Sequence, residues 1–240
     1  MENAVYVSIT RQAGLLQEMQ QVANNVANAA TTGYRREGLV FSEFLRALPL
    51  EGGSLAMAYA HGRLTDTSQG ALSETGNRFD FAIEGEGFFL IETPQGERLT
   101  RAGAFGPNAN GELVDPGGNR LLDAGGAPVF VPPDAAGVSL APDGTLSAGG
   151  APLARIGVVT VADRTALVRE GGTRFRADSG YLPADGARLH QGFLESSNVN
   201  PVSELARMIE VQRSYELGQT FLDREDERIR QVVRTLGQRP

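Results

Sequence analysis

The sequence predicts an α+β protein, with a helix at each end of the chain and an all-β domain between them. Glycine concentrates in the middle: 20 of the 30 glycines lie in residues 80–192, whereas residues 1–32 hold one and residues 193–240 hold two. Helix breakers are therefore frequent only in the middle. Apolar residues recur every seven positions at both ends, so we expect the two helices to pair antiparallel as a coiled-coil core domain.

The first segment, residues 1–33, is expected to be a helix with one narrow apolar stripe. The spacing assigns its members to the a and d positions of a heptad. Thr31 and Thr32 would end the helix, and Gly33 suits a left-handed cap. Because the stripe is rich in alanine, it buries little area per turn. The stripe consists of Ile9, Leu16, Met19, Ala23, Val26 and Ala30.

The middle of the chain divides into two parts. Residues 34–79 are expected to be a linker and extended segment, and residues 80–192 the central β-domain. Apolar residues alternate around residues 79–83, and Asn110-Gly111 and Asp143-Gly144 are hairpin turn pairs. Short strands punctuated by glycine and proline indicate an antiparallel barrel or sandwich. Further strands are expected at 87–91, 129–131, 138–140 and 156–161.

The last segment, residues 193–240, is expected to hold a second, longer helix. Asn200 is a good N-cap, and Pro201 suits the first helical position. A helix of about 35 residues is roughly 50 Å long. Polar Gln212 thins the apolar ladder, so we expect this helix to need the first helix and further copies. The ladder consists of Met208, Tyr215, Leu222, Ile229 and Leu236, flanked by Leu205, Ile209 and Val233.

Composition argues against several classes of protein. The net charge is -7, there is no cysteine, and the two histidines, His61 and His190, lie far apart. A nucleic-acid binder normally has an excess of basic residues, and a metal site needs clustered ligands. We therefore predict no nucleic-acid partner, no metal and no cofactor. No apolar run could span a membrane, and the start of the chain does not resemble a cleaved signal peptide.

Few residues suggest catalysis. Asp80, Glu84 and Glu86 share one parity of a strand, as a carboxylate pair for glycoside hydrolysis would require. A solvated strand face explains them more simply, and we predict no catalytic residue. Arg35 and Arg36, after the first helix, would either contact acidic groups of a partner or start a charged linker.

Three motifs resemble those of the flagellar axial proteins, the family of rod, hook and hook-associated subunits. Residues 22–34, VANNVANAATTGY, are similar to the N-terminal signature of this family. Residues 82–89, AIEGEGFF, resemble its central strand motif. Residues 195–200, ESSNVN, and 208–216, MIEVQRSYE, resemble its C-terminal signature. The short segment between Tyr34 and Asp80 favours a protein of the proximal rod.

The resemblance implies a subunit of a hollow, torque-transmitting rod that spans the periplasm. Its partners would be copies of itself, other rod proteins and the type III export apparatus, which would export it without a cleaved signal peptide. The alternatives are a distal-rod or hook-type protein, or a cell-wall carbohydrate-binding or hydrolytic β-module. The residues expected to pack between subunits are the stripe and ladder residues, Gln212, and the signature residues Asn24, Asn25, Asn28, Gly33, Asn198 and Asn200.

Overall fold

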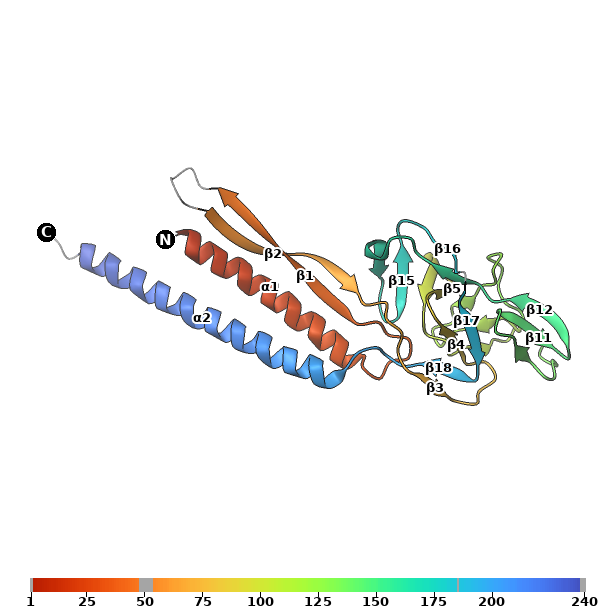
Figure 1. Cartoon of the computed structure of the whole chain (residues 1–240). Helices are drawn as coiled ribbons and strands as arrows, with labels where there is room; N and C mark the ends of the chain where they lie inside the picture. Colours follow the sequence, from red (N-terminus) through yellow and green to blue (C-terminus); the bar gives the residue numbers. More distant parts are fainter. Residues whose placement is uncertain (1, 48–53, 185, 238–240) are drawn as a thin grey trace. The chain divides into compact units, whose positions relative to one another are not determined.

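A computed structural model describes residues 2–47, 54–184 and 186–237 (Figure 1). Two helices at the ends of the chain and many antiparallel strands make it an α+β protein, as predicted. The chain forms two compact units. The helical unit contains residues 1–27, 37–64 and 200–240, and the β unit contains residues 28–36 and 65–199.

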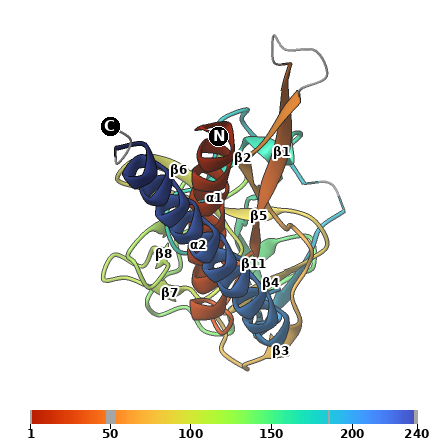
Figure 2. The same ribbon diagram turned by 90° about the vertical axis from the view of Figure 1, so that its left-hand side faces the viewer.

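The helical unit contains α1 (Glu2–Ala27) and α2 (Pro201–Gly237), which lie side by side in Figure 1 and contact each other; in Figure 2 α2 crosses in front of α1. They run antiparallel: a residue near the end of α1 contacts the start of α2, and a residue nearer the start of α1 contacts the middle of α2. Asn25 bonds Glu204, and Gln12 bonds the main chain of Tyr215. Strands β1 (Glu37–Ala47) and β2 (Ser54–Thr65) form a two-stranded sheet, and β1 contacts α1.

The helix ends agree only partly with expectation. Asn200 caps α2 as predicted: its Oδ1 accepts from the N–H groups of Val202 (3.0 Å) and Ser203 (3.2 Å). In contrast, α1 ends at Ala27, short of the predicted residue 33. The Thr31 N–H donates to the main-chain carbonyl of Asn28, three positions earlier, and its hydroxyl donates to Asn28 Oδ1, so the chain makes a tight turn in place of a further helical turn.

The segment expected to be a linker contributes strands to both units. The chain passes between the units after residues 27, 36, 64 and 199. These positions differ from the predicted domain limits of 33, 79 and 192. The reason is that residues 28–36 and 193–199 are bonded to the β unit, as described below.

The β unit is built mainly around one nine-stranded sheet. Its strand order is β14-β15-β6-β5-β9-β8-β7, with β13 pairing both β5 and β16. Three smaller sheets pair β10-β11-β12, β17-β4 and β18-β3, and all these pairs are antiparallel. The bounds are β3 Leu72–Glu74, β4 Phe81–Glu84, β5 Phe88–Thr93, β6 Gly96–Thr100, β7 Gly106–Pro107, β8 Leu113–Val114, β9 Arg120–Leu121, β10 Ser139–Leu140, β11 Thr145–Ala148, β12 Ala151–Arg155, β13 Val158–Thr160, β14 Leu167–Arg169, β15 Arg174–Ala177, β16 Leu182–Pro183, β17 Arg188–Gln191 and β18 Phe193–Glu195, with a 3₁₀ turn at Arg164–Ala166.

Four of the five predicted strands are present, and the prediction for 129–131 is wrong. Val129 and Val131 are buried, but their N–H groups bond two separate segments, at the carbonyls of Leu121 and Gly111. No continuous ladder forms there. The rest of the core is aromatic and aliphatic, with the rings of Phe89 and Phe105 packed edge to face at 5.5 Å.

Three successive loops of the β unit repeat one hydrogen-bonding pattern. The first residue of each loop accepts, through its side-chain Oδ1, from the N–H groups two and four positions later at 2.8–3.0 Å. The fourth residue of each loop, three positions after the first, is a glycine with φ between 80° and 83°. The pattern explains the predicted Asn110-Gly111 turn. The loops are 108–112, 115–119 and 123–127.

The replacement Gly118→Ala tests this loop geometry. Gly118 has a φ of 80°, and a Cβ would meet no atom within 4 Å. The cost is therefore backbone strain alone, and we expect the free energy of unfolding to fall by about 1–2 kcal/mol. Thermal unfolding followed by near-UV circular dichroism measures it. Gly106→Ala is the control, since it lacks both positive φ and steric contact. Equal effects of the two replacements would contradict this account.

Candidate functional site

The N- and C-terminal signatures meet inside the β unit, in a set of segments that we call the collar: residues 33–36, 66–70 and 195–198. The Asn198 side chain joins them. Its Oδ1 accepts from the N–H of Arg36 (2.6 Å), and its Nδ2 donates to the carbonyls of Asp66 and Ser68 (both 3.0 Å). Asn198, which was predicted to pack between subunits, thus connects three separate parts of its own chain.

A buried ion cluster lies next to this junction. Glu195 Oε1 lies 2.6 Å from Arg35 Nη1, and its Oε2 lies 2.8 Å from Arg101 Nε. All three side chains are at most 2% exposed. Glu195 Oε1 also accepts from the N–H of Gly70 at 2.8 Å. Both interpretations of Arg35 in the sequence were wrong, because its guanidinium pairs within its own chain.

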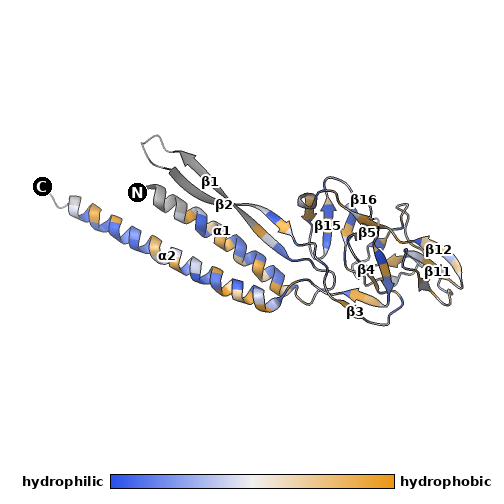
Figure 3. Ribbon diagram, viewed as in Figure 1, coloured by the Kyte–Doolittle hydropathy of each residue, from blue (hydrophilic) through white to orange (hydrophobic). Residues whose placement is uncertain are grey.

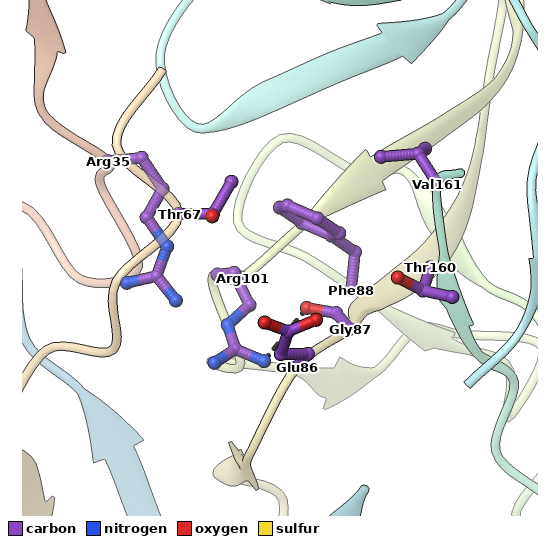
Figure 4. A pocket seen from close by; sticks show the side chains of 8 residues that line it. All are labelled: Arg35, Thr67, Glu86, Gly87, Phe88, Arg101, Thr160 and Val161. Atoms are coloured by element: carbon purple, nitrogen blue, oxygen red, sulfur yellow. Dashed lines mark hydrogen bonds between the residues drawn. The ribbon is translucent and has the colours of Figure 1, made fainter. Parts of the chain in front are cut away.

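Arg101 connects the collar to the central motif. Its Nη1 donates to the carbonyl of Gly87 (2.8 Å) and its Nη2 to that of Gly85 (2.9 Å). Both glycines have positive φ, in the turn between β4 and β5. Figure 4 shows Arg101 next to Glu86 and Gly87. Burial lowers the pKa of Arg101 to about 10, against the attraction of Glu195. The guanidinium stays protonated at neutral pH.

Tyr34 is held by a third arginine, Arg169. The Arg169 guanidinium lies 4.3 Å from the centre of the Tyr34 ring and 4.6 Å from that of Phe175. Arg169 Nη2 also donates to the carbonyl of Arg35 at 2.5 Å. Cation–π contacts of this kind are stronger when desolvated. They fix the N-terminal signature on strands β14 and β15.

Gly33 is required in the collar for two reasons. Its φ is 69°, and a Cβ would lie 2.3 Å from Ala102 N and 2.4 Å from Arg101 C. Its N–H donates to the carbonyl of Glu195 at 2.7 Å. The predicted left-handed conformation is confirmed, but Gly33 does not cap α1. It lets the chain pass close to the backbone of residues 101–102.

The carboxylates considered for hydrolysis have other partners. Asp80 is buried, and its oxygens accept from Thr75 Oγ1 (2.7 Å) and Asn77 Nδ2 (3.0 Å). A solvated face is therefore the wrong interpretation for Asp80. Glu84 Oε2 lies 2.7 Å from His190 Nε2, and this hydrogen bond lowers the pKa of Glu84.

The pocket next to the collar is small and polar (Figure 4). Arg35, Arg101, Thr67 and Thr160 are among its lining residues, and its volume is about 20 Å³. That is room for one water molecule and too little for a sugar ring. Among the described residues, no group of histidine and acidic side chains is placed to hold a metal ion. Within the same residues, no helix is long and apolar enough to cross a bilayer.

The faces that α1 and α2 turn toward each other are largely polar. Asn25 is fully buried: it donates to Glu204 Oε2 (3.0 Å) and bonds both main-chain groups of Glu37 (2.8 and 3.1 Å). Glu18 pairs with Arg207. Gly218 leaves space for Gln12, whose Nε2 would lie 2.3 Å from a Cβ there. Asn25, which was predicted to pack between subunits, thus satisfies buried backbone groups of its own chain.

The predicted apolar stripe of α1 is not the face that α1 buries in this chain. Ile9 is 53% exposed and Leu16 43%, and Ala23 and Ala30 are also exposed. The buried α1 residues include Gln12, Glu18, Gln21, Val22 and Asn25. An apolar stripe marks a contact face but does not identify the partner. Met19, Val26 and Asn28 are half-buried, and Asn24 is exposed.

The α2 ladder divides along its length. Met208, Tyr215 and Leu222 are half-buried, and Val211 beside them is buried. Ile229 and Val233 are exposed, at 44% and 63%. The Leu236 side chain lies outside the described residues. Leu205, Ile209, Gln212 and the cap residue Asn200 are exposed.

Sequence reasoning missed the most buried charged residues. Nothing local indicates that Arg101 and Glu195 meet, because they are 94 positions apart. One signal was available on α1: Glu18 and Asn25 are seven positions apart, so they form a polar row at the same spacing as the apolar stripe.

The replacement Gly33→Ala tests the collar. The added Cβ would overlap the backbone at residues 101–102. We expect a loss of about 3 kcal/mol or more in the free energy of unfolding of the β unit, the range of severe strain and packing defects. Gly76→Ala is the matched control, since Gly76 has the same φ of 69° and open space around it. It should lose only about 1–2 kcal/mol. Chemical denaturation compares the two variants, and similar losses would contradict the close approach.

Two family models match parts of this chain, and several known proteins are similar to it over nearly its whole length. Residues 82–148 match the family model described as flagellar hook protein FlgE/F/G D1 domain. Residues 190–235 match that described as flagellar basal body rod FlgEFG protein C-terminal. The chain is 38% identical to the flagellar basal-body rod protein FlgF of Caulobacter vibrioides and 36% identical to that of Mesorhizobium japonicum.

Both FlgF alignments cover 99% of each chain. The chain is also 30% identical to the flagellar basal-body rod protein FlgG of Bacillus subtilis, over 97% of this chain and 98% of the relative. The chain therefore belongs to the flagellar basal-body rod protein family, in which it is most like FlgF, and is a structural subunit of the basal-body rod.

Proposed function

We propose that this rod subunit assembles through the outer faces of α1 and α2, with copies of itself and with other rod proteins, into a hollow shaft that transmits torque. The observation that carries this proposal is the exposure of large apolar side chains on both helices. Figure 3 shows apolar residues distributed along α2 between polar ones. The exposed apolar residues are Ile9, Leu16, Val202, Leu205, Ile209, Leu217, Phe221, Ile229, Val232 and Val233.

The contact between the two helices supports this proposal, because it uses little apolar surface. The buried positions of α1 are mostly amide and acidic side chains. Exposed apolar surface contributes about 25 cal/mol per Å² when a neighbour covers it. Each added neighbour would therefore stabilise the helical unit. From the heptad spacing we also propose that the two antiparallel helices form a coiled-coil core domain.

The difference in helix length supports it further. α2 has 37 residues and α1 has 26, so the lengths are about 55 and 39 Å. The far part of α2 cannot be matched by an equal length of α1. Charged side chains there pair along α2 itself, Arg228 with Glu225 (2.6 Å) and Arg230 with Asp226 (2.8 Å). The apolar residues between them are available to another subunit.

The remaining parts of the proposal follow from the family. We propose a place in the proximal rod, supported by the higher identity to FlgF than to FlgG. We also propose export by the flagellar type III apparatus without a cleaved signal peptide. A role without catalysis is supported by Asp80, whose two oxygens already accept hydrogen bonds. Heterologous contacts that do not close into a ring would give a helical shaft.

The replacement Ile229→Asp tests the proposed assembly face. Ile229 is 44% exposed, so the free subunit should lose less than about 1 kcal/mol of stability, as surface changes usually do. At a covered interface a charge is costly, and we expect motility and incorporation into basal bodies to be lost. Swimming assays and isolated basal bodies measure the two effects.

The control for this experiment is Gln231→Asp. It places the same charge two positions away, at an exposed polar site of α2, and should leave swimming intact. Normal swimming of the Ile229→Asp strain would count against the proposed face.

A further inference from the structure

The collar is where the β unit begins and ends. The chain enters or leaves the β unit at residues 28, 36, 65 and 199. Within the β unit, the Arg36 carbonyl accepts from the Asp66 N–H at 2.8 Å. The Asn198 side chain bonds both of these residues. Segments 33–36 and 195–198 are therefore joined to each other close to where the chain continues toward α1, β1 and α2.

In the ion cluster of the collar, two guanidinium groups contact one carboxylate. Arg35 and Arg101 both pair with Glu195, and all three side chains are buried. Glu86 also attracts Arg101, and Asp66 is attracted by Arg35, whereas Glu195 bridges the two guanidinium groups. Buried ion pairs often stabilise a fold less than apolar side chains of the same size. The lowered pKa of Arg101 agrees, since the loss of hydration outweighs the attraction of Glu195. Overall stability is thus a poor explanation for this cluster.

Fixing position is a better explanation. Apolar contacts tolerate small shifts, whereas Glu195 accepts two directional hydrogen bonds and makes two short ion pairs. Its carboxylate contacts Arg35, Arg101 and the N–H of Gly70, and its main-chain carbonyl accepts from Gly33. Both arginines also have independent attachments: Arg101 holds the turn at residues 85–87, and the Arg35 carbonyl accepts from Arg169.

We infer that Glu195 is a positioning residue, which locks the N- and C-terminal signature segments onto the β unit in the free subunit, before any neighbour binds. Only its consequence for motility rests on the function proposed above. The lock would fix the two segments that continue into the assembly helices. A subunit without these contacts would keep its β core, but its segments 33–36 and 195–198 would no longer be held in one position on the β unit.

The charge balance predicts unequal effects of two replacements. Glu195→Gln leaves two buried guanidinium groups with no carboxylate between them. Arg35→Gln leaves the balanced pair of Glu195 and Arg101, so only the N-terminal segment loses its ion pair. The two variants therefore separate loss of the whole lock from loss of one half.

Hydrogen exchange on the free, full-length subunit tests the inference. In Glu195→Gln we expect the amides of Gly33 and Gly70 to exchange at least 10-fold faster, while Leu99 in the β5–β6 ladder keeps its protection. In Arg35→Gln we expect only Gly33 to accelerate. Swimming should be lost in Glu195→Gln.

Unchanged exchange at Gly33 and Gly70 in Glu195→Gln would overturn the inference. So would equal acceleration throughout the β unit, because that is the result expected of a residue that contributes only to stability. If Glu195→Gln does not fold, Arg35→Gln still decides: acceleration at both Gly33 and Gly70 contradicts the lock. These exchange results do not depend on assembly, whereas failure of the proposed function appears in the Ile229→Asp strain.

Discussion

The attachment of the two signature segments to the β unit depends on one buried carboxylate. Glu195 lies between two arginines that belong to distant parts of the chain, residues 35 and 101. An unpaired charge in this position would cost several kcal/mol, so the three segments are held together in one arrangement. This requirement also explains the residues around the cluster. Gly33 permits the close approach of the chain to residues 101–102, and Asn198 hydrogen-bonds the main chain of Arg36, Asp66 and Ser68.

The helical unit follows a different rule. Its internal contacts are made by Asn25, Glu18 and Gln12 with Glu204, Arg207 and the main chain of Tyr215. Polar contacts of this kind set register and orientation, and each contributes only about 1 kcal/mol net. Apolar side chains such as Leu217 and Ile209 remain on the outer surface. The pair is therefore well defined in register but poorly covered, which suits a component whose surface is completed by other subunits.

Sequence reasoning succeeded where the determinants are local. The cap at Asn200 and the turns at Asn110-Gly111 and Asp143-Gly144 depend on a few neighbouring residues, and the structure confirms all three. It failed where the partner is distant. The Arg35–Glu195 contact spans 160 positions, and no period or motif reports it. Residues 129–131 are apolar like a strand, but their N–H groups bond two separate segments. The stripe at Ile9 and Leu16 was recognised as apolar, but it is exposed and does not form the seam with α2; its packing between subunits stays a prediction.

The exposure of this stripe has a physical explanation that distinguishes a subunit of a fibre from an ordinary globular protein. In a globular domain the apolar stripe of a helix faces the core, because nothing else removes it from water. In a chain destined for an assembly, the stripe can face outward as long as polar contacts hold the helices together in the meantime. The buried row of Asn25, Glu18 and Gln12 meets this condition. The β unit differs, because it encloses its own aromatic and aliphatic core and the ion cluster of the collar. One chain thus combines a unit with an apolar core and a unit whose helices meet through polar contacts.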